Sequence, residues 1–513
     1  MTAWTSGYVT DLGYTHGFYR ELTPALLNFV ALAKGQRGLD LGGGLDYCEL
    51  GCGQGFSMNL LASANPQVRF HATDFNPSQI AGARALAAEA GLTNVTFYEN
   101  SFADFADHPG LPESFDVISL HGIYSWISEG NRAAIVEFIR RKLRAGGLVY
   151  ISYNTLPGWA AAAPMRHLMY LHGKAKGGPT ISRLGPALAF VDQMQQSGAA
   201  FFRANPGMKE RFERLKVMNR NYLAHEYLND AWTLLYHSDV AQELSAAKLT
   251  YLGSAALLDH VDAVNLTPEQ QQIMAGIDDP VLRETMRDYM VNQQFRRDVF
   301  VKGGLPAPNR VLVETWLDLR LALSTNRADV PLTVRGALGE ANLSPEVYNP
   351  ILDALKEMPK TLRELMTNST IAGFGWERIR QALTMLVGAG HLQPCLSAKD
   401  EGKRARTTKS FNQAVMQRAQ DSGELLFLAS PVTGGGLVVD RLQQLFLKAM
   451  EEGRKQPEDW AGAAWPVLAS QGQRIVKEGK PLENPEDNLA ELTTQARAFA
   501  EKQLPVLRSL QVA

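Results

Sequence analysis

The spacing of hydrophobic and polar positions changes near residue 160 of the chain. Before that point, short apolar runs alternate with amphipathic runs, which predicts strands alternating with helices. The expected strands cover 46–50, 68–74, 95–98, 115–121 and 147–153, and the expected helices lie near 56–64, 78–90 and 131–144. This alternation is typical of an α/β fold, in which a parallel sheet has helices on both faces and binds ligands beyond the carboxyl ends of its strands.

Beyond residue 160 long helical patterns begin. Expected helices cover 161–177, 185–203, 206–221, 267–298 and 310–324, and two more lie near 438–453 and 486–509. Residues 331–397 read as helix, helix, turn and short strand, the outline of a winged helix, whereas 403–409 reads as a charged loop. We therefore expect five parts: an N-terminal helical lid (1–44), a Rossmann-like domain (45–160), a helical domain (161–330), a winged-helix-like module (331–400) and a mostly helical C-terminal region (401–513).

Two strand ends carry the first candidate chemistry. Residues 47–56 read Tyr-Cys-Glu-Leu-Gly-Cys-Gly-Gln-Gly-Phe, a carboxylate followed by glycines at alternate positions. Glycine suits a tight turn from a strand into a helix and lets a ligand approach the backbone. The next strand ends in a carboxylate at residue 74, which can accept hydrogen bonds from ribose hydroxyls. The candidate cofactor contacts at these two ends are Glu49, Gly51, Cys52, Gly53, Gly55, Asp74, Phe75 and Asn76.

The glycine spacing distinguishes between nucleotide cofactors. A dinucleotide-binding turn has G-x-G-x-x-G, which presents helix amides to a pyrophosphate, whereas this turn reads E-x-G-x-G-x-G. A carboxylate beside the turn repels a diphosphate and suits a ligand with an amino group, which favours S-adenosylmethionine over NAD. The stretch resembles the first two motifs of the class I S-adenosylmethionine-dependent methyltransferases. The resemblance implies that the three glycines line the amino-acid end of the cofactor and that Asp74 binds its ribose.

The segment after the third strand departs from that family. The family usually has an acidic residue here that contacts the adenine amino group, but the register places Ser101 at this position, with Asp104 three residues later. The adenine contact therefore stays open. We favour Ser101 and Phe102 for it, and Asp104 is a candidate helix cap.

Polar and aromatic side chains follow the fourth and fifth strands, at 121–126 and 153–159. In the class I fold the segment after the fourth strand faces the sulfonium, and aromatic faces attract cations. We expect three residues to orient the acceptor, with no assigned general base: His121, which also lies near the cofactor, Tyr124 and Tyr153. Further candidate substrate contacts are Tyr8, Tyr14, Trp126, Asn154 and Trp159. Two structural alternatives remain open, since the N-terminal tyrosines could pack a helix and Tyr124 and Trp126 could anchor one.

Three runs carry a closer resemblance: 121–126, 153–159 and 222–229. Together they are similar to bacterial methyltransferases with a methyltransferase regulatory domain, a group that includes rickettsial protein-lysine methyltransferases. The resemblance implies direct methyl transfer to a nitrogen nucleophile, with a protein substrate and lysine as the acceptor. Two alternatives stay open: a small-molecule methyltransferase, and a non-catalytic regulator that binds S-adenosylmethionine and a partner. The Asn-Pro-Pro-Tyr signature of amino-methylating DNA enzymes does not follow the fourth strand, which disfavours DNA as a substrate.

Composition narrows the environment and the partners. A net charge of −2 gives no electrostatic reason to expect nucleic acid or an anionic membrane as the main partner. The three cysteines are too few for a disulfide framework, and no further ligands complete a metal site around Cys48 and Cys52. No apolar run approaches the ~20 residues that span a bilayer, and the N-terminus does not resemble a signal peptide. We therefore expect a cytoplasmic protein without metal; its oligomeric state is open.

Overall fold

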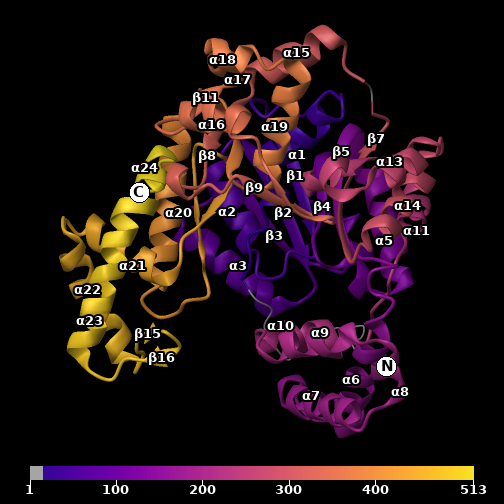
Figure 1. The fold of residues 1–513 in the computed structure, drawn as a ribbon, viewed down its shortest axis with the longest axis horizontal. Helices are drawn as coiled ribbons and strands as arrows, with labels where there is room; N and C mark the ends of the chain where they lie inside the picture. The colour runs from indigo at the N-terminus through magenta and orange to yellow at the C-terminus, as the bar shows by residue number, and fades with distance from the viewer. Residues whose placement is uncertain (1–15, 305) are drawn as a thin grey trace.

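The centre of the computed structural model, which describes residues 16–304 and 306–513, is a seven-stranded sheet. Its strand order is β3-β2-β1-β4-β5-β7-β6 (Figure 1). The first five strands are parallel, and β7 runs antiparallel to both of its neighbours. The strands are β1 (Leu45–Leu50), β2 (Val68–Asp74), β3 (Val95–Glu99), β4 (Phe115–Leu120), β5 (Leu143–Asn154), β6 (Leu249–Ser254) and β7 (Phe295–Lys302). The predicted α/β fold is confirmed, and strands β1 to β5 lie within a few residues of their expected positions.

Helices cover both faces of this sheet. Strands β1 and β4 are buried along their whole length, as expected for strands that face a helix layer on each side. Adjacent residues of β1 point to opposite layers: Tyr47 joins one hydrophobic core and Cys48 the other. The first core is shared with α1 (Pro24–Ala33), α2 (Phe56–Ala64) and α3 (Pro77–Glu89), and the second with α4 (Phe102–Phe105), α5 (Glu129–Lys142) and α11 (His237–Ser245).

The last two strands of the sheet come from a segment that the pattern assigned to helices. The predicted helix over 267–298 is wrong at its C-terminal end, because the segment forms α13 (Pro268–Ala275), α14 (Pro280–Val291) and then β7. Helix α14 ends at Asn292, which adopts the left-handed conformation (φ 52°) common at helix C-termini. The chain can therefore turn back and pair with β5 over seven residues.

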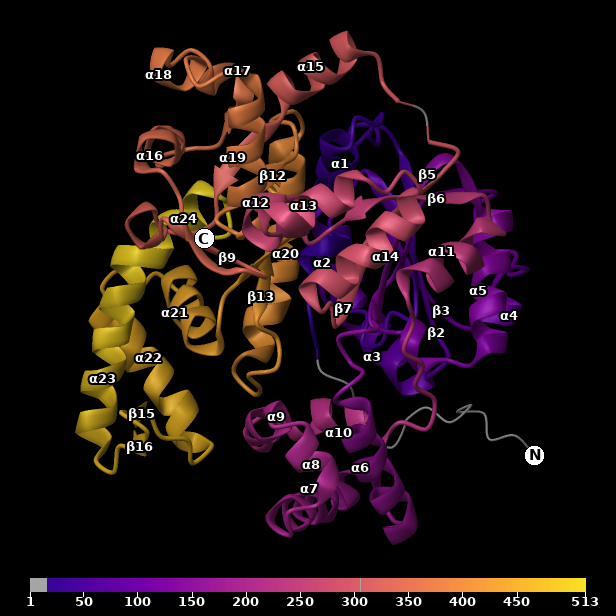
Figure 2. The ribbon, with the colours of Figure 1, turned by 45° about the vertical axis from the view of Figure 1, so that its right-hand side comes forward.

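A separate helical lobe, here called the cap, comprises residues 163–228. Its helices are α6 (Ala163–Lys176), α7 (Thr180–Gln196), α8 (Ala200–Ala204), α9 (Gly207–Lys216) and α10 (Arg220–Leu228). The cap has its own hydrophobic core, which includes Met165, Leu184 and Phe212. Figures 1 and 2 show it as a distinct lobe below the sheet. It follows β5 directly, so it begins at the carboxyl edge of the parallel strands.

The rest of the chain packs beside the sheet on the side of α2 (Figure 2). Around the segment predicted as a winged helix, β11, β8 and β12 form a small antiparallel sheet. These elements are β8 (Arg320–Leu323), β9 (Thr333–Gly336), β10 (Gly339–Asn342), β11 (Lys360–Thr361), β12 (Leu392–Cys395), α12 (Asp262–Asn265), α15 (Asn309–Asp318), α16 (Pro345–Ala354), α17 (Leu362–Leu365), α18 (Ser369–Ala372) and α19 (Trp376–Gly388). The C-terminal elements are α20 (Glu401–Arg418), β13 (Phe427–Ala429), β14 (Gly436–Val438), α21 (Arg441–Glu451), α22 (Pro457–Ser470), β15 (Val476–Lys477), β16 (Lys480–Pro481), α23 (Pro485–Ala498) and α24 (Leu504–Ser509).

The predicted charged loop at 403–409 is wrong, because these residues belong to helix α20. Arg404 is buried and donates hydrogen bonds to the carbonyl oxygens of Ser397 (2.6 Å), Lys399 (2.8 Å) and Pro431 (2.7 Å). The same helix packs on α2, where the Thr407 hydroxyl donates to the Ser63 carbonyl at 2.6 Å. A run that looks solvated in the sequence is thus part of the contact between the C-terminal region and the sheet domain.

Candidate cofactor and acceptor site

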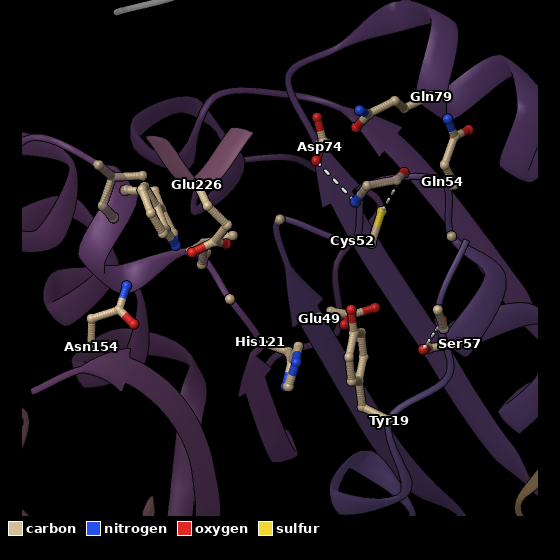
Figure 3. A pocket seen from close by; sticks show the side chains of 18 of the residues that line it. Tyr19, Glu49, Cys52, Gln54, Ser57, Asp74, Gln79, His121, Asn154 and Glu226 are labelled. Carbon is tan, nitrogen blue, oxygen red and sulfur yellow. Dashed lines mark hydrogen bonds between the residues drawn. The ribbon is translucent and has the colours of Figure 1, made fainter. Parts of the chain in front are cut away.

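A cavity of about 560 Å³ lies between the carboxyl ends of the parallel strands and the cap. Figure 3 shows part of its lining. Most of the residues predicted from the sequence come together here. Those that line the cavity are Glu49, Gly51, Cys52, Gly53, Gly55, Asp74, Phe75, Ser101, Phe102, His121, Trp126, Asn154 and Trp159.

The glycine turn after β1 requires glycine at each alternate position. Gly51, Gly53 and Gly55 have φ values of +76°, +51° and +64°, a region that residues with a Cβ rarely adopt. At Gly55, an added Cβ would lie 2.5 Å from the Ala83 Cβ and 2.7 Å from the Phe97 ring. At Gly53 the nearest atom would be 3.8 Å away. Gly55 therefore permits close packing of the turn, whereas Gly53 leaves open space toward the cavity.

Asp74 ends β2 and is held by backbone amides. Its Oδ2 accepts from the Gly53 amide at 3.0 Å and its Oδ1 from the Asn76 amide at 2.9 Å. Burial raises the pKa of the carboxyl, and these two hydrogen bonds oppose that shift. A carboxylate can accept about four hydrogen bonds, so the anchored group keeps acceptor capacity for hydroxyl groups in the cavity.

Glu49 is a buried carboxylate that forms no ion pair within residues 16–304 and 306–513. Within the described residues, its Oε2 has no hydrogen-bond partner. Burial and the nearby Asp74 raise the pKa of Glu49 to about 8. A cation placed beside it would favour the ionised form and remove that penalty. The orphaned carboxylate, the open glycine turn and the anchored Asp74 therefore fit a ligand that combines an amino group with a ribose.

His121 forms part of the wall in the middle of the cavity. Burial, and then the positive charge of Arg297, lower its pKa to about 3, so the imidazole is neutral at physiological pH. Its Nδ1 lies 2.9 Å from the Tyr150 hydroxyl, and its ring stacks on Tyr19 at a centroid distance of 3.5 Å. These contacts fix the ring in place as an uncharged aromatic surface.

The structure does not support three of the predicted contacts. Tyr124 is fully buried and its hydroxyl donates to Glu243, while the Tyr153 hydroxyl donates to Asp298 at 2.7 Å. Successive residues of a strand face opposite ways, so Asn154 reaches the cavity and Tyr153 points into the core. Asn76 is buried as the N-cap of α3, where its side chain accepts from the Ser78 amide. The hydroxyl groups of Tyr124 and Tyr153 are therefore hydrogen-bonded to carboxylates, and the side chain of Asn76 caps a helix.

Two further predictions have different outcomes. Ser101 lines the cavity and is also the N-cap of α4, and its hydroxyl donates to Asp104 at 2.6 Å. The N-cap of this helix is thus Ser101, whereas the sequence made Asp104 the candidate. Tyr8 and Tyr14 lie outside the described residues, so their predicted role as a lid stays a prediction. The described segment that follows does reach the cavity, through Tyr19 and Glu21.

The cap and β7 contribute residues that were not expected at the site. Those absent from the predicted set are Arg211, Tyr222 and Glu226 of the cap and Gln294, Phe295 and Arg297 around the start of β7. The sequence signal for them was the run 222–229, which carries part of the resemblance to methyltransferases with a regulatory domain. Among the lining residues there are four carboxylates, on Glu21, Glu49, Asp74 and Glu226, and two guanidinium groups. Acidic side chains therefore outnumber basic side chains in the cavity lining.

In residues 16–304 and 306–513, no group of three or more histidine, cysteine or acidic side chains is arranged to hold a metal ion. Of the helices that these ranges contain, none is both long and apolar enough to cross a bilayer.

Comparisons with known proteins agree with this geometry. Residues 41–177 match a family described as "Methyltransferase domain", and residues 219–302 match the "Predicted methyltransferase regulatory domain". Protein sll1526 of Synechocystis is 46% identical over 507 residues, which cover 99% of each chain. Protein RP789 of Rickettsia prowazekii is 28% identical over 260 residues, 50% of this chain and 46% of that protein. The solved structure of PKMT2 from Rickettsia typhi in complex with AdoHcy covers 98% of this chain and 100% of its own, with a TM-score of 0.70 at 18% identity, a likeness of fold.

Proposed function

Because the chain belongs to the class I S-adenosylmethionine-dependent methyltransferases that carry a methyltransferase regulatory domain, we propose that it methylates the side-chain amine of lysine in a protein. The chain is a methyltransferase, and its cofactor is S-adenosylmethionine. The identity of the acceptor is what we add.

One observation carries this choice of acceptor: the cap side of the cavity is aromatic and acidic. Trp126, Trp159 and Asn154 line it together with Glu226. Aromatic faces and a carboxylate attract an ammonium group. The resemblance of the runs at 121–126, 153–159 and 222–229 to rickettsial protein-lysine methyltransferases supports a lysine.

The chain's own residues would bind and orient the reactants. When bound, S-adenosylmethionine supplies an electrophilic methyl group on a positively charged sulfur. We assign its ribose to Asp74 and its amino group to Glu49, with the turn from Gly51 to Gly55 against its amino-acid end. Neutral His121 and the tryptophans would exclude water and hold the amine in line. Alignment of this kind can lower a barrier by about 7 kcal/mol or more.

A labelling experiment tests the proposal. The purified protein is incubated with S-adenosylmethionine carrying a deuterated methyl group and with a bacterial lysate, and peptides are analysed by mass spectrometry. We expect trideuteromethyl groups on lysine side chains, and none with the Asp74→Ala variant. Label found only in small molecules would assign the acceptor to that class. Cofactor binding without any transfer would favour the non-catalytic regulator.

A further inference from the structure

Glu226 is the acidic group that the cap presents to the cavity. It lies on α10, lines the cavity and is half-buried. Figure 3 shows Glu226 and Asn154 on one side of the cavity and Asp74 and Glu49 on the other, with His121 between them. The carboxylate is therefore remote from the groups assigned to the cofactor and lies where an acceptor would enter.

In the part of the chain that the structure describes, no hydrogen bond or ion pair reaches either carboxylate oxygen of Glu226. The charged and titratable groups that interact with it are Arg166 of α6 and Tyr222 and Tyr227 of α10, and Arg211 of α9 lines the same cavity.

The two nearby guanidinium groups are already engaged elsewhere. Arg166 donates to the Asn229 carbonyl at 2.6 Å and lies over the Trp232 ring at 4.6 Å. Arg211 lies over the Trp159 ring at 4.2 Å and donates to Gln294 at 3.2 Å. Neither forms an ion pair with Glu226, so burial prevails and raises its pKa to about 7.

We propose that Glu226 is the acceptor-side carboxylate, which binds the ammonium group of the incoming lysine and takes its proton. This inference rests on the proposed function and adds a residue that the comparisons do not assign. A half-buried carboxylate in a cavity that Trp126 and Trp159 also line offers the charge and the aromatic surface that suit a primary ammonium group. The ionised carboxylate can hold the cation and then serve as the base that accepts a proton from it.

The proposed step balances as follows. One N–H bond of the ammonium group breaks, the proton passes to a Glu226 oxygen, and the nitrogen keeps the electron pair. That pair forms the new C–N bond while the methyl C–S bond breaks, and the electrons of that bond stay on sulfur. The product is a methylammonium group, and the proton on Glu226 is released to water after the product leaves.

The test compares Glu226→Gln with Glu210→Gln. Glu210 is an exposed glutamate on α9 that pairs with Arg214 and does not line the cavity. The first measurement is binding of n-butylammonium in the presence of S-adenosylhomocysteine, followed by tryptophan fluorescence. The second is kcat/KM for methyl transfer to lysate proteins. Calorimetry of S-adenosylmethionine binding checks that each variant is folded, and Glu226→Asp tests for partial rescue.

We expect wild-type protein and Glu210→Gln to bind n-butylammonium about tenfold more tightly at pH 8 than at pH 6, because Glu226 ionises between these values. Glu226→Gln should bind weakly at both pH values and lose kcat/KM by about 100-fold or more, with unchanged cofactor affinity. If Glu226→Gln binds n-butylammonium like wild type, the inference is overturned whatever its activity. If the wild type binds the amine through Glu226 but methylates no protein, the subsite stands and the proposed function fails.

Discussion

Replacing Glu49 with glutamine should stabilise the ligand-free protein and weaken its binding of cofactor. The Glu49 carboxyl is buried beside Asp74, and its pKa rises from 4.5 to about 8. The folded protein therefore keeps this group protonated at a pH where the unfolded chain would ionise it. The resulting cost is absent below pH 4.5, grows between pH 4.5 and 8, and is constant above pH 8.

The size of this effect follows from the shift in pKa. Each pH unit above 4.5 costs about 1.4 kcal/mol, so the penalty is below about 1 kcal/mol at pH 5 and about 3 kcal/mol at pH 7. Glutamine has a similar shape and cannot ionise, so Glu49→Gln should remove the penalty. The same change removes a charge-assisted hydrogen bond to the cofactor's amino group, which corresponds to a loss of about 10- to 100-fold in affinity.

Urea unfolding at pH 5 and pH 7, followed by circular dichroism, measures the first effect, and calorimetry with S-adenosylmethionine measures the second. The control is Glu113→Gln, at an exposed position, which should change neither. Equal stabilisation at both pH values would refute the role of ionisation. Unchanged cofactor affinity would refute the contact with the amino group.

Four further substitutions separate folding from chemistry. Gly55→Ala should lose about 2 to 5 kcal/mol of stability in urea unfolding, because positive φ and contact with Ala83 combine, whereas Gly53→Ala should lose about 1 to 2 kcal/mol. Tyr124→Phe should cost about 1 to 2 kcal/mol and keep the methyl-transfer rate within about threefold, since the buried hydroxyl binds Glu243; a loss of about 100-fold would restore its catalytic role. Arg404→Met should lower the thermal midpoint by removing three hydrogen bonds worth about 3 kcal/mol or more and leave the cofactor affinity of the folded protein unchanged, so weaker binding would contradict a purely structural role.

The parallel strands and the glycine turn could be predicted because their signals are local. Apolar runs of strand length marked β1 to β5, and the glycines from Gly51 to Gly55 occupy positions whose positive φ values require that residue. Asp74 could be placed with them because parallel strands end at the same edge of a sheet.

The remaining features depend on residues far away in the sequence. The Tyr124 hydroxyl donates a hydrogen bond to Glu243, the Tyr153 hydroxyl donates one to Asp298, and Arg404 donates one to a carbonyl 27 residues away. No local sequence pattern predicts these partners. The place of β7 in the sheet likewise depends on pairing with β5, across the whole cap. Glu226 reaches the cavity only because the cap folds back over the strand ends, so its role is visible only in three dimensions.

The central claim is that the glycine turn and Asp74 form the binding site for S-adenosylmethionine. Isothermal titration calorimetry of the wild type, Gly53→Val and Asp74→Ala with this ligand tests it most directly. We predict one site in the wild type and at least about tenfold weaker binding in each variant, since each loses space or hydrogen bonds at the ligand. Wild-type affinity in both variants would contradict the claim.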